Sequence, residues 1–505
     1  MKPLRLLHLS FGCLLVLQAA CLNAPAQSVV QAWVQRYTGP ANDNDDKPVA
    51  VKIGANGQVF VTGTSRSVAD AQNIVTVSYS STGVPLWTNR YGIAAGVEAV
   101  AMVITSDGNV VVTGYAATLF PGFATVAYSS AGLPLWTNLY SAGSDEPKAI
   151  AADGNGNVFV TGSSLGSLFT DWATIAYSST GVPLWTNRYE KAPQSQDGAI
   201  TIAVAGNGNV IVGGNSYVAP QSYGEVIAYS NSGVPLWTNT YPLTDMGVNV
   251  LSTGSNNNIF VAGTAPGVNP GDYNYLTYSI SNNGTLLWSK QYKGVTDYQQ
   301  ATAIAVGSDR VFVTGLAFGP NGREFATIAY TGNGVGLWTN LYVPQSSPGY
   351  QAWAYALAVS TNNDVYVAGM HNSTNGSQDF LTLAYNSAGL SLWTNHYDGP
   401  GEVEDMLHSR DSIALSPDGS VVVTGSSLST NGTYYATVKY TGPIPIGVQT
   451  FGPNVVLTWD YGVFNLQAAP TPTGVFTNVP AATSPFTNTF TPVAPPTLYY
   501  RLQAN

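Results

Sequence analysis

One motif, Trp-x-x-x-Tyr, recurs eight times along the 505-residue chain and constrains its fold more than any other feature. Its tryptophans follow one another at intervals of 49 to 55 residues: Trp33, Trp87, Trp136, Trp185, Trp237, Trp288, Trp338 and Trp393. A near-constant period of this length indicates a repeat architecture, in which each unit buries its faces only against its neighbours. The repeat therefore takes precedence over a domain count based on length.

Three further strand-like segments stand between successive tryptophans. In the third unit they are Ala149–Ala151, Val158–Gly162 and Ala173–Tyr177. Turn-forming pairs such as Asn56-Gly57 and Asp107-Gly108 separate the first two segments, which predicts hairpins. Charged residues make up only 9% of the chain, and the abundance of Val, Thr, Tyr and Gly favours strands over helices. Each unit is thus predicted to be a four-stranded antiparallel blade of an all-β propeller.

The two ends of the repeat region are complementary. The first unit supplies only the strand from Trp33 to Tyr37, and the last unit stops at Tyr440 without its own Trp strand. We expect the N-terminal strand to complete the last blade and close an eight-bladed ring without unpaired edges. A solenoid is the competing geometry, but it needs polar caps and does not explain the complementary missing strands.

Two segments carry a family resemblance that covers the region from Val30 to Thr441. The run Ala176-Tyr-Ser-Ser-Thr-Gly-Val-Pro-Leu-Trp185 resembles the tryptophan-docking motif of quinoprotein-type propellers, and Asp153-Gly-Asn-Gly-Asn-Val-Phe-Val-Thr-Gly162 resembles the bacterial SBBP-type β-propeller repeat. The resemblance implies that each Trp docks between adjacent blades. It does not carry dehydrogenase activity over, because the chain beyond the predicted signal has no cysteine for a vicinal disulfide and no singular Asp-rich insertion.

Three regions are predicted: a signal peptide at 1–26, the propeller at 27–441 and a small β domain at 442–505. The junction Gly442-Pro443-Ile444-Pro445 ends the repeat, and strands are expected at 455–459, 464–467 and 498–502. The Trp-then-Tyr order of this last region resembles a truncated fibronectin type III or related sandwich module.

The N-terminus has the features of a secretory signal. Lys2 and Arg5 precede an apolar stretch from Phe11 to Ala20, and Ala24-Pro25-Ala26 provides a small-residue cleavage site. Both cysteines, Cys13 and Cys21, lie within this signal. A lipoprotein anchored through Cys21 is the alternative. We expect a secreted protein, at the cell surface, outside the cell or in the periplasm.

Charge and hydropathy limit the partners. The net charge is −10 and no run of Lys or Arg could neutralise successive phosphates, which argues against nucleic acid as a partner. No apolar run after the signal approaches the roughly 20 residues that span a bilayer. We expect a monomer that binds a protein or a polysaccharide.

Acidic residues commonly precede the first strand of a unit, and they are the candidate metal ligands: Asp46, Glu98, Glu146, Asp197, Asp245 and Asp297. If they ring one mouth of the propeller, their oxygens could hold Ca²⁺. The alternative is that each acid only bonds the backbone of its own loop. No other cofactor is expected.

Two divergent loops provide the candidate binding residues. The loop from Tyr342 to Tyr355 contains the aromatic side chains Tyr350, Trp353 and Tyr355, which could stack on sugars or anchor a protein, or could pack beneath their loop. The loop from Asp398 to Asp411 is elongated and concentrates charge, and its candidates are Glu402, Glu404, Asp405 and His408.

These features favour an exported noncatalytic propeller that acts as a binding or scaffolding module. The alternative is a carbohydrate-active hydrolase or lyase that uses Glu402, Glu404, Asp405 or His408, and a purely structural protein is a third possibility. The sequence has no Gly-x-Ser-x-Gly elbow with a suitable histidine and no phosphate-binding loop.

Overall fold

A computed structural model describes residues 29–504, except for 41–44, 70, 167, 242–246, 268–271, 295–297, 320–321, 344–350, 374–375, 401–403, 431, 443–446, 452–453, 459–463, 472–474, 481, 484 and 490–498. The described residues form strands and turns and contain no helix, and so none that could cross a membrane. The chain divides into two compact units, which are 35–437 and the combination of 1–34 with 438–505.

Seven sheets are four-stranded, and in each the strands pair in chain order. We number these blades 1 to 7. Their strands are β2 (Lys47–Ile53), β3 (Val59–Arg66), β4 (Gln72–Tyr79) and β5 (Pro85–Tyr91); β6 (Val97–Ile104), β7 (Val110–Ala116), β8 (Gly122–Tyr128) and β9 (Pro134–Tyr140); β10 (Asp145–Ala152), β11 (Val158–Leu165), β12 (Thr170–Tyr177) and β13 (Pro183–Tyr189); β14 (Gln196–Val204), β15 (Val210–Val218), β16 (Gln221–Tyr229) and β17 (Pro235–Tyr241); β18 (Val248–Thr253), β19 (Ile259–Pro266), β20 (Tyr273–Ile280) and β21 (Leu286–Tyr292); β22 (Gln299–Val306), β23 (Arg310–Gly319), β24 (Gly322–Thr331) and β25 (Gly336–Tyr342); and β26 (Ala352–Val359), β27 (Val365–Asn372), β28 (Gln378–Tyr385) and β29 (Ser391–Tyr397).

The sheet of blade 8 has the strand order β1-β33-β32-β30, with β31 also pairing β32. Its strands are β1 (Val30–Tyr37), β30 (Asp405–Met406), β31 (Ile413–Leu415), β32 (Val421–Ser429) and β33 (Gly432–Thr441). The segment that should form one first strand is thus split into β30 and β31, and the residues between them leave the sheet.

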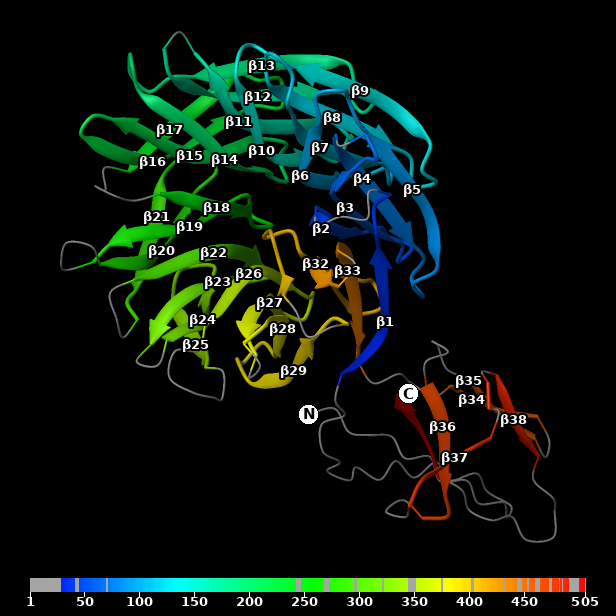
Figure 1. Cartoon of the computed structure of the whole chain (residues 1–505). Coiled ribbons are helices and arrows are strands. Elements are labelled where there is room, and N and C mark those ends of the chain that lie inside the picture. Colours follow the sequence, from blue (N-terminus) through cyan, green and yellow to red (C-terminus); the bar gives the residue numbers. More distant parts are fainter. Residues whose placement is uncertain are drawn as a thin grey trace. The chain divides into compact units, whose positions relative to one another are not determined.

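The first strands line the centre of the ring (Figure 1). Each contacts the first strand of the next blade, from β2 through β6, β10, β14, β18, β22 and β26 to β31, and β31 contacts β2. The described residues therefore form an eight-bladed propeller, as the repeat predicted.

A β-bulge interrupts the first strand of blades 1 to 7. In blade 3 the register shifts between Pro147 and Ala149, so that Lys148 is the extra residue. The second strand passes close to this bulge at a glycine, and a Cβ on Gly162 would lie 2.1 Å from the carbonyl oxygen of Glu146. The recurring glycine at the end of each Val-x-Val-Thr-Gly segment is thus required by a close approach of two backbones.

The hydrophobic core lies between neighbouring blades. Phe60 and Ile74 of blade 1 pack against Val97, Met102 and Tyr128 of blade 2 in one such layer. Because both faces of a blade are covered, its middle strands are buried on both sides and do not alternate with polar residues.

In blades 1 to 6 the tryptophan of the fourth strand docks on the next blade. Trp87 Nε1 donates to the carbonyl oxygen of Ser130 at 3.0 Å, and Asn89 Nδ2 donates to that of Gly132 at 2.7 Å. A Cβ on Gly132 would lie 2.7 Å from the Trp87 ring. The same indole bond is made by Trp136, Trp185, Trp237, Trp288 and Trp338. The docking role implied by the family resemblance is confirmed for these six residues.

The C-terminal region contains two three-stranded sheets. The first is β34 (Gly447–Phe451), β35 (Asn454–Thr458) and β38 (Phe486–Thr489), and the second is β37 (Thr477–Asn478), β36 (Phe464–Ala469) and β39 (Tyr499–Ala504). The three strands expected here correspond to β35, β36 and β39.

Candidate functional site

The two faces of the ring differ in how strictly their turns repeat. The first face carries the turns between strands one and two and between strands three and four. In blades 1 to 7 each three-to-four turn is closed by the same two backbone bonds, as in Ser80 N–H to Val84 O with Gly83 N–H to Ser80 O. The second face carries the two-to-three hairpins and the loops between blades, which differ in length and sequence. We call it the variable face, and the candidate residues that the structure describes belong to this side.

Four blades begin with a buried aspartate that bonds its own loop. Oδ2 of Asp46 accepts the backbone N–H of Gly39 at 2.6 Å, and Oδ2 of Asp197 accepts that of Lys191 at 3.0 Å. Asp145 and Asp405 make the equivalent bonds. In blades 3, 4 and 8 the cross-strand partner of this aspartate is a serine. These four aspartates therefore bond the backbone of their own loops. The sequence analysis gave this role as the alternative to metal binding.

The candidate metal ligands are not equivalent to one another. Asp46 and Asp197 are buried, whereas Glu98 and Glu146 are exposed, and Glu146 contacts Lys148. In blade 3 the buried position belongs to Asp145, one residue before the predicted Glu146. Asp245 and Asp297 lie outside the described residues. A calcium-binding ring formed by this set remains a prediction.

Arg410, in the elongated loop of blade 8, reaches across the centre of the ring. Arg410 Nη1 donates to the carbonyl oxygen of Asn249 at 2.8 Å, and Nη2 donates to that of Ile200 at 2.9 Å. Both acceptors are bulge residues, in blades 5 and 4 respectively, on the far side of the central channel from blade 8. Burial lowers the pKa of Arg410, and the neighbouring Asp411 opposes this effect.

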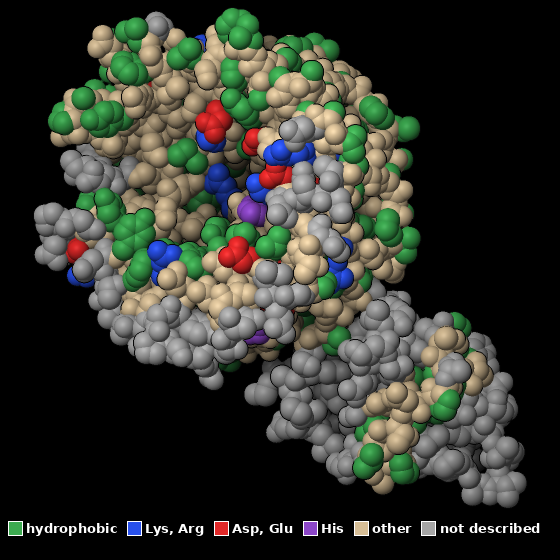
Figure 2. Space-filling model, in the orientation of Figure 1, with side chains coloured by type: hydrophobic (Ala, Val, Ile, Leu, Met, Phe, Trp, Pro, Cys, Tyr) green, Lys and Arg blue, Asp and Glu red, His purple; other side chains and the backbone are tan. Residues whose placement is uncertain are grey.

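An ion pair joins the same loop to blade 1. Lys52 Nζ lies 2.5 Å from Oδ1 of Asp411, and Val51 N–H donates to the Asp411 carbonyl oxygen. Burial alone would raise the pKa of Asp411, but Lys52 and Arg410 hold it below its usual range. Figure 2 shows basic, acidic and histidine side chains gathered around the central hollow. Two charged residues of this loop, Arg410 and Asp411, are therefore used inside the ring.

The other candidates of this loop lie apart. Glu404 is exposed, Asp405 is buried in β30, and Glu402 lies outside the described residues. His408 Nε2 lies 2.5 Å from Oγ of Ser426. His408 remains accessible to water, but the surrounding protein desolvates it and lowers its pKa to about 4, with a smaller contribution from Lys47.

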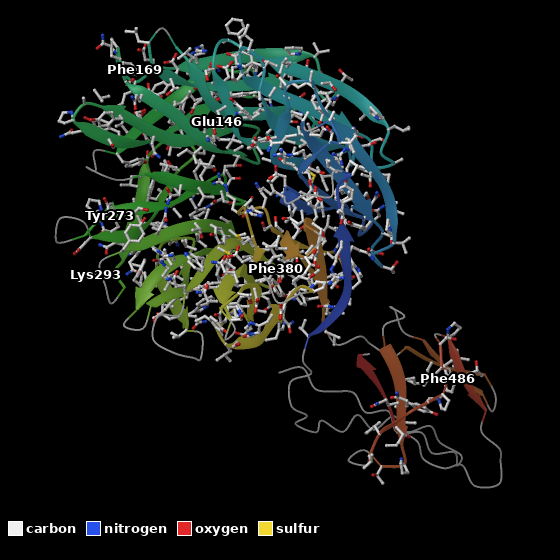
Figure 3. The ribbon with its side chains drawn as sticks, viewed as in Figure 1. Glu146, Phe169, Tyr273, Lys293, Phe380 and Phe486 are labelled. Atoms are coloured by element: carbon white, nitrogen blue, oxygen red, sulfur yellow. The ribbon has the colours of Figure 1, made fainter. Side chains whose placement is uncertain are left out.

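Aromatic side chains from three blades form a continuous row on the variable face. Tyr273, labelled in Figure 3, packs against Tyr298 with ring centroids 5.4 Å apart, and Tyr298 packs against Phe318 at 5.8 Å. The Arg323 guanidinium lies over the Phe318 ring at 5.3 Å and over the Trp353 ring at 5.1 Å. We call these five residues the aromatic strip. Tyr298 is the most open, with 40% of its surface exposed.

The predicted aromatic loop thus contributes one residue to a larger surface. Trp353 belongs to the strip, whereas Tyr355 is the half-buried bulge residue of β26 and burial raises its pKa. Tyr350 lies outside the described residues. The sequence analysis missed Tyr273, Tyr298, Phe318 and Arg323, which come from other loops. A comparison of aromatic residues across all two-to-three hairpins could have found Tyr273 and Phe318.

Two histidines that are distant in sequence form a pair in blade 7. His396 Nδ1 lies 2.7 Å from His371 Nε2, and His371 Nδ1 lies 3.0 Å from the carbonyl oxygen of Asn372. Since a carbonyl only accepts, His371 carries its proton on Nδ1 and His396 donates from Nδ1. Burial lowers the pKa of both, so both are neutral near pH 7.

Comparison with solved structures finds distant similarities. The chain resembles solved structures of puromycin hydrolase in complex with PGG (S511A mutant; identity 10%, TM-score 0.44, 77% of this chain and 61% of that one), polysaccharide lyase Uly1 (11%, 0.44, 71% and 98%) and Sqt1 from Chaetomium thermophilum bound to the N-terminus of ribosomal protein L10 (9%, 0.49, 82% and 100%). The chain therefore spans less than two thirds of puromycin hydrolase. At these identities and TM-scores the similarity assigns no function.

Sequence comparisons match a smaller part of the chain than the structural comparisons do. A search among curated proteins found no match. The family described as SBBP, a beta-propeller repeat, matches residues 136–170, from the docking Trp of blade 2 to the start of β12 in blade 3. The chain is thus an eight-bladed β-propeller with a segment that matches the SBBP repeat.

Proposed function

We propose that this protein is an exported noncatalytic propeller that binds a protein or a polysaccharide through its variable face. The aromatic strip carries the proposal. Aromatic rings with one open edge and an adjacent guanidinium offer stacking surface and hydrogen-bond donors together, the combination that recurs at binding hot spots. The strip is built from blades 5, 6 and 7, so that the rigid ring sets the spacing of its members.

Glycan arrays and immobilised cell-envelope proteins would test this function. Because a hot-spot residue contributes more than about 1 kcal/mol, Tyr298→Ala and Trp353→Ala should weaken binding of the retained ligand by about fivefold or more. Phe120→Ala is the control, since Phe120 is 64% exposed in a two-to-three hairpin of blade 2 and lies outside the strip. Binding that all three variants retain equally would refute the role of the strip.

We also propose that the N-terminal strand closes the ring. Three contacts near its end support this arrangement. The Tyr37 and Tyr435 rings are 5.2 Å apart, Arg36 donates to the Tyr397 hydroxyl at 3.1 Å, and Arg90 of blade 1 donates to the Tyr37 hydroxyl at 2.6 Å. The end of β1 thus contacts blades 7, 8 and 1. A chain that begins after residue 37 should fail to form a stable ring, as measured by thermal unfolding.

For the regions that flank the propeller, we propose that residues 1–26 direct export and that residues 442–505 form a small sandwich-like module, related to fibronectin type III, that acts as a spacer or attachment element. The two C-terminal three-stranded sheets are compatible with such a sandwich. Mass spectrometry of the exported protein would test the cleavage after Ala26. Expression of residues 442–505 alone would test whether this region folds independently.

A further inference from the structure

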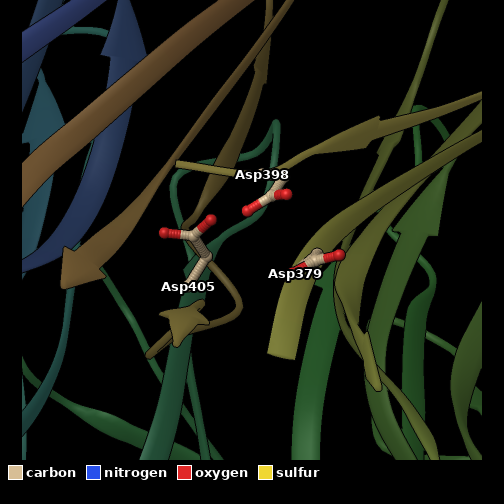
Figure 4. Close-up of side chains that lie close together, drawn as sticks. All are labelled: Asp379, Asp398 and Asp405. Atoms are coloured by element: carbon tan, nitrogen blue, oxygen red, sulfur yellow. The ribbon is translucent and has the colours of Figure 1, made fainter. Parts of the chain in front are cut away.

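Three aspartates converge where blade 7 meets blade 8 (Figure 4). Asp379 lies in β28, Asp398 follows β29, and Asp405 belongs to β30. One carboxylate oxygen of each lies within 4.8 Å of the other two, and within the described part of the chain no other group of three or more Asp, Glu, His or Cys has this spacing. A Ca²⁺ ion holds its oxygen ligands at about 2.3–2.6 Å, so two ligands of one ion lie at most about 5 Å apart. The spacing of the three carboxylates fits a shared cation.

A buried oxygen in this cluster gives independent support. Asp405 is completely buried, and its Oδ2 accepts the N–H of Gly399 at 2.6 Å. Its Oδ1 is also buried and makes no hydrogen bond of normal geometry, because the nearby Ser427 hydroxyl donates to Tyr434; Oδ1 of Asp197, at the equivalent position of blade 4, is unpaired in the same way. A buried carboxylate oxygen without a partner is unfavourable unless a cation or a proton neutralises it.

The junction of blades 3 and 4 provides an internal comparison, because it has acids at the three equivalent positions. Asp171 pairs with Ser164 as Asp379 pairs with His371, Glu190 follows the fourth strand as Asp398 does, and Asp197 bonds its loop as Asp405 does. These three acids do not share the close spacing.

The two groups of acids differ in the residue that the fourth strand places beside the first acid. Arg188 pairs with Asp171, with Nη2 and Oδ2 2.8 Å apart. In blade 7 the position of Arg188 is occupied by His396, which pairs with Leu381 as Arg188 pairs with Ala173. His396 is neutral near pH 7 and bonds His371. Asp379 therefore has no guanidinium beside it where the equivalent Asp171 has one.

We propose that Asp379, Asp398 and Asp405 form a calcium site that joins blade 7 to blade 8. Three carboxylates form a hard oxygen donor set, which suits Ca²⁺ better than a softer transition metal. Asp398 is exposed, so water can complete the coordination shell. The ion would connect the fourth strand of blade 7 to β30, next to the loop that spans the channel.

Calorimetric titration with Ca²⁺ of the purified chain, after removal of metal with EDTA, tests the site. One saturable binding event is expected, and bound Ca²⁺ should raise the thermal unfolding temperature. Asp379→Asn and Asp405→Asn should each weaken binding by about tenfold or more. The matched controls Asp171→Asn and Asp197→Asn change the equivalent residues of blades 3 and 4 and should leave Ca²⁺ affinity unchanged.

Two exposed positions separate loss of the site from loss of folding. Asp398→Asn should weaken binding, whereas Glu190→Gln at the equivalent position should not, and neither side chain is part of a core. His396→Arg should also abolish binding by supplying the guanidinium that Arg188 supplies in blade 3. Absence of Ca²⁺ binding up to about 10 mM, well above the range of extracellular calcium modules, would overturn the proposal. Unchanged affinity in Asp379→Asn and Asp398→Asn would do so too.

Discussion

The Nη2 atom of Arg410 lies 2.9 Å from the carbonyl oxygen of Ile200, 210 positions earlier in the chain. The bulge that frees this carbonyl from the sheet and the split of the last inner strand into β30 and β31 are both needed for the contact. A single side chain thus ties blade 8 to the opposite side of the ring.

Replacement of Arg410 should destabilise the ring. Arg410→Ala removes two charge-assisted hydrogen bonds, and we expect the free energy of unfolding to fall by about 2 kcal/mol or more. Arg410→Lys retains the charge but not the forked geometry of the guanidinium. Its free energy of unfolding should therefore lie between those of Arg410→Ala and the wild type. Urea denaturation measures the difference, and a loss below about 0.5 kcal/mol in Arg410→Ala would contradict the structural role.

Removal of a docking indole should lower the free energy of unfolding by more than replacement of Arg410 does. Trp185→Ala deletes the contact with the next blade and the bond to the Asn231 carbonyl oxygen, and a loss of about 3–5 kcal/mol is expected. The neighbouring Leu184 is 47% exposed, so Leu184→Ala should change stability by less than about 0.5 kcal/mol. Chemical denaturation of both variants compares the two sides of one strand.

Two glycines with the same backbone conformation separate backbone strain from the docking contact. Gly108 and Gly132 have φ angles of +81° and +83°, but a Cβ on Gly108 meets nothing within 4 Å, whereas one on Gly132 meets the Trp87 ring at 2.7 Å. Gly108→Ala should cost about 1–2 kcal/mol from the left-handed conformation alone. Gly132→Ala should cost about 1–3 kcal/mol more because of the overlap with Trp87. Equal losses in urea denaturation would show that the turn does not hold the indole.

The protonation of His408 should make stability depend on pH. Its pKa in the folded chain is about 4, below the usual value of 6.5, so the unfolded chain binds more protons between these values. The free energy of unfolding contributed by His408 is therefore fully present above about pH 6.5 and is lost as the pH falls towards 4. His408→Gln should reduce the loss of stability between pH 7 and pH 4.5. An unchanged pH profile, measured by denaturation at several pH values, would exclude this contribution.

The fold was predictable from sequence because its main contacts are short in range. Six of the tryptophans meet the next blade 43 to 49 residues later, in each case six residues before the next Trp, so the spacing of the contact follows the period of the repeat. The turn glycines and the buried Val-Thr-Gly segments follow from the same local geometry. The markers in the sequence are thus the docking contacts themselves.

The candidate sites were less predictable, because their members come from different blades. Trp353 was identified from its loop, but Tyr273 and Tyr298 became relevant only when blades 5 and 6 were placed side by side. Asp405 was identified as part of a charged loop, whereas Asp379, which lies close to it in space, belongs to a largely apolar strand segment. Arg410 gave no local signal of its partners, since Ile200 and Asn249 contribute only backbone oxygens. Such groupings depend on the ring and not on any one repeat.

The segregation of regular turns to one face has a consequence for how such a chain can change. The docking indoles and their glycine turns lie among the regular connections, whereas the described residues in the loops of the opposite face make none of these bonds. Loops there could be lengthened, exchanged between blades or acquire new residues during evolution while the joints between blades persist. The same property would let a protein engineer graft foreign peptides onto the hairpins of this face.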